Sequence, residues 1–160
     1  MRRPIAAVAL AGLCLTGCSV SPVQGLDGSD GDVLFLEDLK DGDSFVATDG
    51  AEYRVGLINT PERSECGGSE AMAQTAAMLA YGFVAQVYAE DTHGRQVARV
   101  RTSDGDLGVQ LARLGFADDR YLDGFRSENP SYAAELEVAF GEAYTAGAGL
   151  WSSCWSGGAN

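Results

Sequence analysis

Apolar and polar residues alternate along the first half of the chain in the manner of half-buried β-strands. The alternation covers residues 32–39, 43–48 and 52–59, and it returns at 84–90 and 96–102. Between the second and third segments, the stretch TDGA contains an Asp-Gly pair, which is a strong hairpin-turn signal. The pattern predicts five strands.

Apolar residues take helical spacing in three other segments. The first helix follows the third strand, with Ser69 as its candidate N-cap. The second runs from a cap at Asp106 to Gly115, and the third begins near Pro130 and closes at Gly147. Each helix has one apolar face. That face consists of Met72, Ala76, Leu79 and Phe83 in the first helix, Leu107, Leu111 and Leu114 in the second, and Leu136, Phe140 and Ala143 in the third. This order indicates a small α+β domain, in which a closed five-stranded barrel would remove the sheet edges.

The first eighteen residues, MRRPIAAVALAGLCLTGC, have the composition of a secretory signal. Two arginines precede an apolar run, residues 5–15, that is too short to span a bilayer. The ending LTGC resembles the lipobox of bacterial lipoproteins, in which the cysteine, here Cys18, is lipidated and becomes the first mature residue. The alternative is an ordinary signal peptide that ends near a cysteine.

The lipoprotein interpretation divides the chain into four parts. Residues 1–17 are the signal peptide, 18–31 a flexible tether rich in Gly, Ser and Asp, 32–154 a single domain, and 155–160 a C-terminal tail. We therefore expect a monomer that is exported across the cytoplasmic membrane and held on its outer face by acyl chains.

Two cysteines remain once Cys14 is cleaved off and Cys18 is acylated. They are Cys66 and Cys154, and an oxidising extracytoplasmic compartment favours a disulfide between them. Two free thiols are the alternative.

The mature chain is strongly acidic. The formal net charge of −12 becomes −14 when Arg2 and Arg3 are removed, and Lys40 is the single lysine. Because surfaces that bind polyanions broadly are normally basic, this charge argues against non-specific nucleic-acid binding. It leaves room for a small site where a cation and a few arginines dominate the local field.

The stretch DGDSF places Asp41 and Asp43 on either side of a glycine at a strand start. Two neighbouring carboxylates repel each other, and a hard cation between or near them relieves the repulsion. Oxygen-only ligands suit calcium or magnesium. A plain acidic turn is the alternative for this motif.

A second group of polar residues is suited to phosphodiester chemistry. Arg54 lies on the strand of YRVGLINTPE, and Arg95 lies in the turn DTHGR. Guanidinium groups bind phosphate oxygens in bidentate fashion and stabilise charge that develops on phosphorus. A carboxylate such as Glu62 can position or deprotonate the attacking water. Each residue alone could equally be a surface charge.

Taken in order, DGDSF, YRVGLINTPE, DTHGR, LARLGFA and the late GLW resemble the staphylococcal-nuclease-like (thermonuclease) domain family. The resemblance covers nearly the whole mature domain. It implies a five-stranded oligonucleotide-binding (OB) β-barrel with three α-helices. It also implies calcium-dependent hydrolysis of DNA and RNA, with magnesium as a possible substitute.

The resemblance carries over residue by residue to a cation site. It makes Asp43 a direct calcium ligand and places Asp41 in an outer, water-mediated position. Asn59 occupies the place of the second carboxylate ligand, and the backbone carbonyl of Thr60 would be a third ligand.

The resemblance also implies roles in the reaction. Glu62 would orient or activate the water, and Arg54 and Arg95 would bind the scissile phosphate and stabilise its transition state. Tyr121 would pack on the nucleotide as a substrate-binding residue.

The chain departs from the family pattern at three places. Asn59 keeps a carbonyl oxygen but loses a charge, which weakens calcium binding by about 1–3 kcal/mol. The turn before Arg95 reads Thr-His-Gly where the family usually has Lys-Tyr-Gly, and Asp118 and Asp119 add negative charge near the path of a nucleic-acid strand. Both of these changes should reduce binding to long polyanions more than they affect hydrolysis.

The favoured hypothesis is an extracytoplasmic, metal-dependent nuclease acting on DNA, RNA or both. One alternative is a non-catalytic lipoprotein whose OB-fold binds nucleic acid or nucleotide. Another is a structural lipoprotein that binds neither metal nor nucleic acid.

Overall fold

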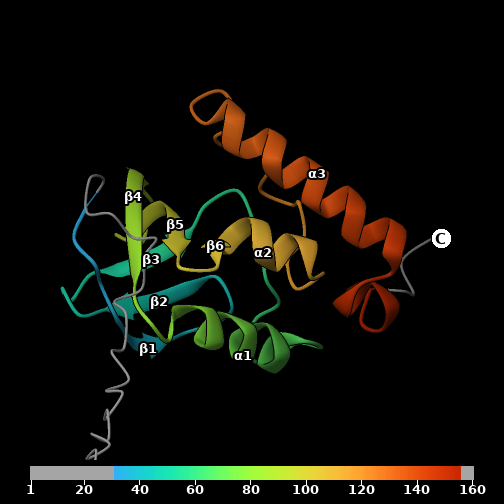
Figure 1. Cartoon of the computed structure of the whole chain (residues 1–160), viewed down its shortest axis with the longest axis horizontal. Coiled ribbons are helices and arrows are strands. Elements are labelled where there is room, and N and C mark those ends of the chain that lie inside the picture. The colour runs from blue at the N-terminus through green and yellow to red at the C-terminus, as the bar shows by residue number, and fades with distance from the viewer. Residues whose placement is uncertain (1–30, 156–160) are drawn as a thin grey trace, which may run out of the picture.

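The computed structural model describes residues 31–155, and it contains strands gathered on one side and helices stacked beside them (Figure 1). The signal peptide, the lipidation site at Cys18 and the tether lie outside the described residues, except Gly31. In chain order the elements are β1 Leu36–Leu39, β2 Ser44–Ala47, β3 Glu52–Val55, α1 Gly68–Leu79, β4 Phe83–Glu90, β5 Gln96–Thr102, β6 Gly105–Asp106, α2 Leu107–Arg113, α3 Pro130–Ala146 and the 3-10 helix η1 Gly149–Ser152.

The strands form one mixed sheet in the order β1-β2-β3-β5-β4, with the two-residue β6 paired to β5. β3 and β5 run parallel, and the other pairs are antiparallel. Leu34, just before β1, forms an isolated antiparallel bridge with Phe83 at the start of β4. The α+β class with three α-helices is confirmed, and β6 is a strand that the sequence pattern did not indicate.

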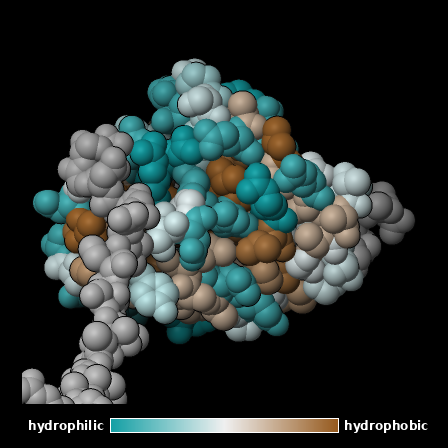
Figure 2. Space-filling model, viewed as in Figure 1, coloured by the Kyte–Doolittle hydropathy of each residue, from teal (hydrophilic) through white to brown (hydrophobic). Residues whose placement is uncertain are grey.

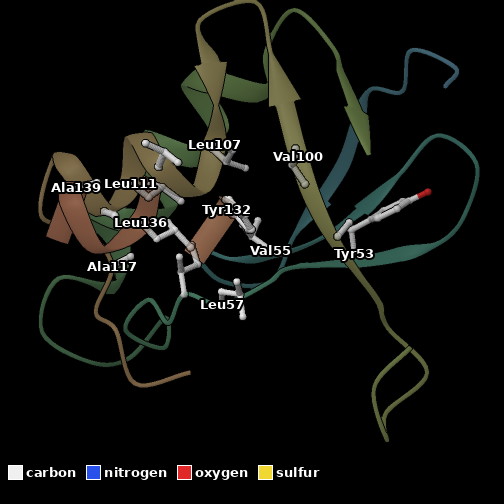
Figure 3. Packing of buried hydrophobic residues seen from close by; sticks show 14 of the residues in the cluster. Tyr53, Val55, Leu57, Val100, Leu107, Leu111, Ala117, Tyr132, Leu136 and Ala139 are labelled. Atoms are coloured by element: carbon white, nitrogen blue, oxygen red, sulfur yellow. The ribbon is translucent and has the colours of Figure 1, made fainter. Parts of the chain in front are cut away.

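The core lies between the sheet and the helices, and Figure 3 shows part of it around Val55, Tyr132 and Leu136. α2 packs between α1 and α3, with Leu107 and Leu111 fully buried (Figure 1). The third residue of that predicted face, Leu114, is 40% exposed and lies at the C-cap of α2. In the described residues no helix has the length and apolar character that crossing a membrane needs.

Two predicted boundaries were wrong at the ends of α1. The helix begins at Gly68 after a left-handed Gly67 (φ 86°), and the Ser69 hydroxyl donates to Glu70 instead of capping the helix. Phe83, expected on the helix, begins β4 and is fully buried. Gly82, in a left-handed conformation, ends the helical segment and turns the chain into the strand.

The third predicted strand was too long. β3 ends at Val55, and the chain turns through Gly56 and Leu57, which has a left-handed φ of 65°. Glycine is required at position 56 because an added Cβ would lie 1.6 Å from the Tyr88 hydroxyl oxygen. This turn takes Asn59, Thr60 and Glu62 off the sheet and into a loop.

The predicted disulfide between Cys66 and Cys154 is confirmed, and it links two residues 88 positions apart. It fastens the segment after η1 to the loop that precedes α1. Leu150 of η1 packs on the same loop, since a Cβ at Gly67 would lie 2.5 Å from its methyl carbons. The C-terminal segment of the domain is therefore held against the loop between β3 and α1.

Candidate functional site

The sheet register brings two arginines to one serine. Ser44 on β2 is the cross-strand partner of Arg54 on β3, and Arg95 immediately precedes β5, the parallel neighbour of β3. The Ser44 hydroxyl oxygen accepts from Arg54 Nη1 at 3.5 Å and from Arg95 Nη1 at 3.3 Å. The two guanidinium groups therefore converge on one point although they lie far apart in the sequence.

Asp43 is buried directly beneath this point, with 1% of its surface exposed. Its Oδ1 accepts from Arg54 Nη1 and from the Ser44 hydroxyl at 2.9 Å, and its Oδ2 accepts from the Thr60 backbone N–H at 2.8 Å. Burial raises the pKa of Asp43 to about 7; the Arg54 guanidinium opposes this rise and the nearby Asp41 carboxylate adds to it. For this carboxylate the effect of burial thus outweighs that of the Arg54 guanidinium beside it.

Asp41 belongs to the same turn. Its Oδ1 accepts from the backbone N–H of Asp43 at 3.0 Å, which fixes the Asp-Gly-Asp motif as a tight loop. An added Cβ at Gly42 would lie 2.9 Å from the Thr60 hydroxyl oxygen, so only glycine lets this loop approach Thr60 so closely.

The loop after β3 completes the site. Arg54 Nη2 donates to the backbone carbonyl of Ile58 at 3.2 Å, and Thr60 is bound to Asp43. Glu62 is exposed, and its backbone N–H donates to Glu65 Oε2 at 3.0 Å. The contacts of Ile58 and Thr60 hold the loop against Arg54 and against the Asp43 carboxylate that pairs with it.

Arg54, Arg95 and Glu62 border one open cleft of about 340 Å³. Asp43, Ser44 and Thr60 are buried and are not among its lining residues. Tyr121 stands at its side, half exposed, with its ring centroid 5.3 Å from Arg54 Cζ. The cleft thus offers cations, two carboxylates and aromatic faces together. Its lining consists of Arg54, Gly56, Leu57, Ile58, Asn59, Glu62, Asp91, Thr92, His93, Arg95, Val97, Tyr121, Gly124 and Phe125.

Asp91 orients Arg95. Its Oδ2 lies 2.7 Å from both Nε and Nη2 of Arg95, and its Oδ1 accepts from the backbone N–H groups of His93 and Arg95. Burial favours a higher pKa for Asp91, but these hydrogen bonds outweigh it and lower the pKa. The turn therefore keeps an ionised carboxylate behind the guanidinium.

Asn59 is paired with Asp118 across the loop. Their backbones form an antiparallel bridge, with N–H to carbonyl distances of 3.1 and 2.7 Å in the two directions. Asn59 Nδ2 also donates to Asp118 Oδ2 at 3.1 Å.

The residues expected to bind calcium have suitable donor chemistry. Asp41, Asp43, Asn59 and Thr60 supply only oxygen, which hard cations prefer. The Thr60 hydroxyl oxygen is buried with no hydrogen-bond partner. Across residues 31–155 no three His, Cys, Asp or Glu side chains converge as a metal cluster, so the backbone and Asn59 would have to contribute. The types of donor atom therefore suit a calcium or magnesium ion.

A family model described as staphylococcal nuclease homologue matches residues 52–153. The chain belongs to this family. The matched range includes Arg54, Asn59, Glu62 and Arg95. The Asp-Gly-Asp loop lies before residue 52, where the match begins. A search among curated proteins finds no match.

As a member of the staphylococcal nuclease homologue family, the chain has site neighbours that sequence patterns did not reveal. Ser44, which joins both arginines, follows Asp43 directly and reads as an ordinary strand residue. Asp91 could have been found as a carboxylate four positions before Arg95 in one turn. Asp118 lies 59 positions from Asn59, and no local pattern indicates that they meet.

Proposed function

We propose that this protein is a calcium-dependent nuclease that hydrolyses phosphodiester bonds of DNA, RNA or both. The observation that carries the proposal is the convergence of Arg54 and Arg95 on the Ser44 hydroxyl, together with the presence of both arginines and Glu62 in the lining of one cleft. Two guanidinium groups at one point suit a single phosphate with several anionic oxygens. Membership of the nuclease family supports the same activity.

In this proposal the chain's own residues divide the reaction among them. Arg54 and Arg95 bind the phosphate, and Tyr121 packs against the nucleotide. Glu62 orients a water molecule and takes its proton as the water oxygen forms a bond to phosphorus. The bond from phosphorus to the leaving oxygen then breaks, and the arginines stabilise the charge on the remaining phosphate oxygens.

Calcium bound by Asp43, Asn59 and the Thr60 carbonyl, with Asp41 in an outer position, would supply further positive charge beside the phosphate. Magnesium has the same ligand preferences and is the possible substitute.

We further propose that the sheet curls into the OB barrel that the resemblance implies. The bridge between Leu34 and Phe83 supports this, because it joins the segment before β1 to β4 at the opposite edge of the sheet. We also propose, from the lipobox-like LTGC, that Cys18 carries the acyl chains that hold the monomeric domain outside the cytoplasmic membrane.

The test is a calcium-dependent digestion of single-stranded DNA and of RNA by the purified protein. We expect Arg54→Ala, Arg95→Ala and Glu62→Gln each to lower kcat/KM by about 10²-fold or more. Arg113→Ala is the matched control, because Arg113 pairs with Glu142 on the surface between α2 and α3 and should leave activity unchanged.

If the wild-type protein leaves both nucleic acids intact in ample calcium, hydrolysis is not its function. Stabilisation by nucleotide without turnover would then favour the non-catalytic binding module, which Asn59 and the acidic surface also suit.

A further inference from the structure

The pairing of Asn59 with Asp118 bears on the cation site. Asn59 stands where the family pattern has a second carboxylate ligand, so one negative charge is missing from the ligand set. The carboxylate of Asp118 lies directly beside it, 3.1 Å from Asn59 Nδ2. The negative charge that position 59 lacks is thus carried by Asp118, its neighbour in space.

Asp118 is held firmly in this place. Two backbone hydrogen bonds join it to Asn59, and its Oδ1 accepts from the backbone N–H of Arg120 at 3.0 Å. Its side chain is only 17% exposed, whereas the Arg120 side chain, whose Nη2 lies 3.6 Å from Asp118 Oδ2, is 67% exposed. The exposed guanidinium is therefore a weak counter-ion for Asp118.

An ionised carboxylate accepts hydrogen bonds and donates none. Next to Asp118, the Asn59 side chain must therefore present its NH₂ group to that carboxylate, which leaves its carbonyl oxygen on the side away from Asp118. Asn59 also lines the cleft together with Arg54, Glu62 and Arg95. A carbonyl oxygen that is fixed in one orientation and polarised by a carboxylate is a better cation ligand than a freely rotating amide.

We propose that Asp118 is a positioning residue of the cation site, which orients the Asn59 carbonyl oxygen toward the cation and restores the negative charge that asparagine lacks. The inference rests on the proposed calcium dependence. It assigns the second carboxylate of the site to the segment after α2 instead of to the loop after β3.

Calcium affinity of the full chain, measured by calorimetry and by the calcium-induced rise in Tm, tests the proposal without reference to activity. Asp118→Asn keeps a hydrogen-bond acceptor for Asn59 but removes both the charge and the fixed orientation. We expect it to raise the Kd for calcium about tenfold or more, in line with other outer-shell partners of metal ligands. The control is Asp119→Asn, which removes the same charge from the adjacent exposed residue and should change the Kd less than about twofold.

The double variant Asn59→Asp with Asp118→Asn moves the carboxylate back to position 59 and should restore the Kd to within about threefold of wild type. If Asp118→Asn alone fails to fold, the double variant still tests the proposal, because it keeps one carboxylate and one amide in the pair. Asn59→Asp alone would place two carboxylates in contact, and we expect it to lower the Tm in chelator while tightening calcium binding.

If wild type binds calcium but Asp118→Asn binds it equally well, or if the double variant binds no more tightly than Asp118→Asn, the inference is overturned while the proposed function stands. If wild type binds no calcium, the inference and the calcium dependence of the proposed function both fail.

Discussion

At the scale of single residues, the most unusual group is the buried carboxylate of Asp43. It is surrounded by Arg54, the Ser44 hydroxyl and the Thr60 N–H, yet burial still raises its pKa to about 7. Its ionised form is therefore less favourable in the folded protein than in the unfolded chain, where the ordinary value is near 3.8. A buried acid of this kind is expected at a functional site more often than in a purely structural core.

This raised pKa predicts a pH dependence of stability in calcium-free protein. Below about pH 4 Asp43 is protonated in both states, and between about pH 4 and about pH 7 only the folded state keeps the proton. A rise in pH through this window therefore favours unfolding, and the loss is complete above the folded pKa. The effect is measured as the difference in the free energy of unfolding between about pH 5 and about pH 8, from denaturation in the presence of a chelator.

Asp43→Asn should remove this contribution, so the comparison of wild type with the variant isolates it from other carboxyl groups. Wild type should lose more stability than the variant as pH rises. Equal slopes for the two proteins would show that Asp43 titrates normally in the fold.

At the scale of elements, the loop between β3 and α1 carries much of the site, and its shape depends on close backbone contacts. Gly68, the first residue of α1, lies against this loop, because an added Cβ would fall 2.0 Å from the carbonyl oxygen of Glu62. The start of the helix therefore sets the position of Glu62, the proposed general base.

Gly68→Ala should displace Glu62, lower the free energy of unfolding by about 1–3 kcal/mol and reduce nuclease activity. Gly141→Ala, in the interior of α3, is the matched control because, apart from the backbone of its own helix, no atom lies within 4 Å of its added Cβ. The control should stabilise the protein by about 0.5–1 kcal/mol through helix propensity and leave activity unchanged. Denaturation curves and kcat/KM, measured for both variants, test this prediction. The prediction is wrong if Gly68→Ala and Gly141→Ala have the same stability and activity.

The disulfide between Cys66 and Cys154 fastens the far end of the same loop. Replacing both cysteines by serine should cost about 2–5 kcal/mol of stability, since an 88-residue separation gives a large loop-closure effect. Because the bond lies four residues beyond Glu62, we also expect a partial loss of activity. A reducing agent should reproduce both effects in wild type and have no effect on the double variant. Unchanged stability in the double variant would mean that Leu150 and its neighbours hold the loop without the bond.

At the scale of the whole molecule, the formal charge of −12 opposes the approach of a polyanion. Polar side chains cover most of the face seen in Figure 2, with smaller apolar patches between them. The arginines of the cleft attract phosphate only at short range, whereas the negative net charge repels a polyanion at longer range. Long nucleic acids should therefore meet a repulsion that a short substrate largely escapes.

With saturating calcium, we expect kcat/KM on long duplex DNA to rise several-fold between about 10 mM and about 100 mM salt, because the screening length falls from about 30 Å to about 10 Å. A dinucleotide-sized substrate should change less than about twofold over the same range. A steep fall with salt on long DNA, as basic nucleic-acid-binding proteins show, would contradict this expectation.

Periodicity and local chemistry predicted much of the fold. The apolar alternation located β1 to β5, although β1 and β3 cover only half of their predicted segments. The Asp106 cap is confirmed, since its side chain accepts from the Val109 N–H at 3.0 Å. Boundaries were missed where glycines and tertiary contacts overrode the pattern, as at Gly67 before α1 and at Gly56 after β3. The reason is that a local pattern reports which face of a segment is apolar, whereas close packing decides where the segment must end.

The sequence by itself determined the α+β class, the order of the elements and the types of residue available for phosphate and cation chemistry, because these depend on local periodicity and on side-chain chemistry. Only the tertiary structure decided that Arg54 and Arg95 meet at Ser44, that Asp43 is buried beneath them and that Asp118 lies against Asn59. These contacts follow from strand register and loop packing between distant segments, which no short stretch of sequence encodes.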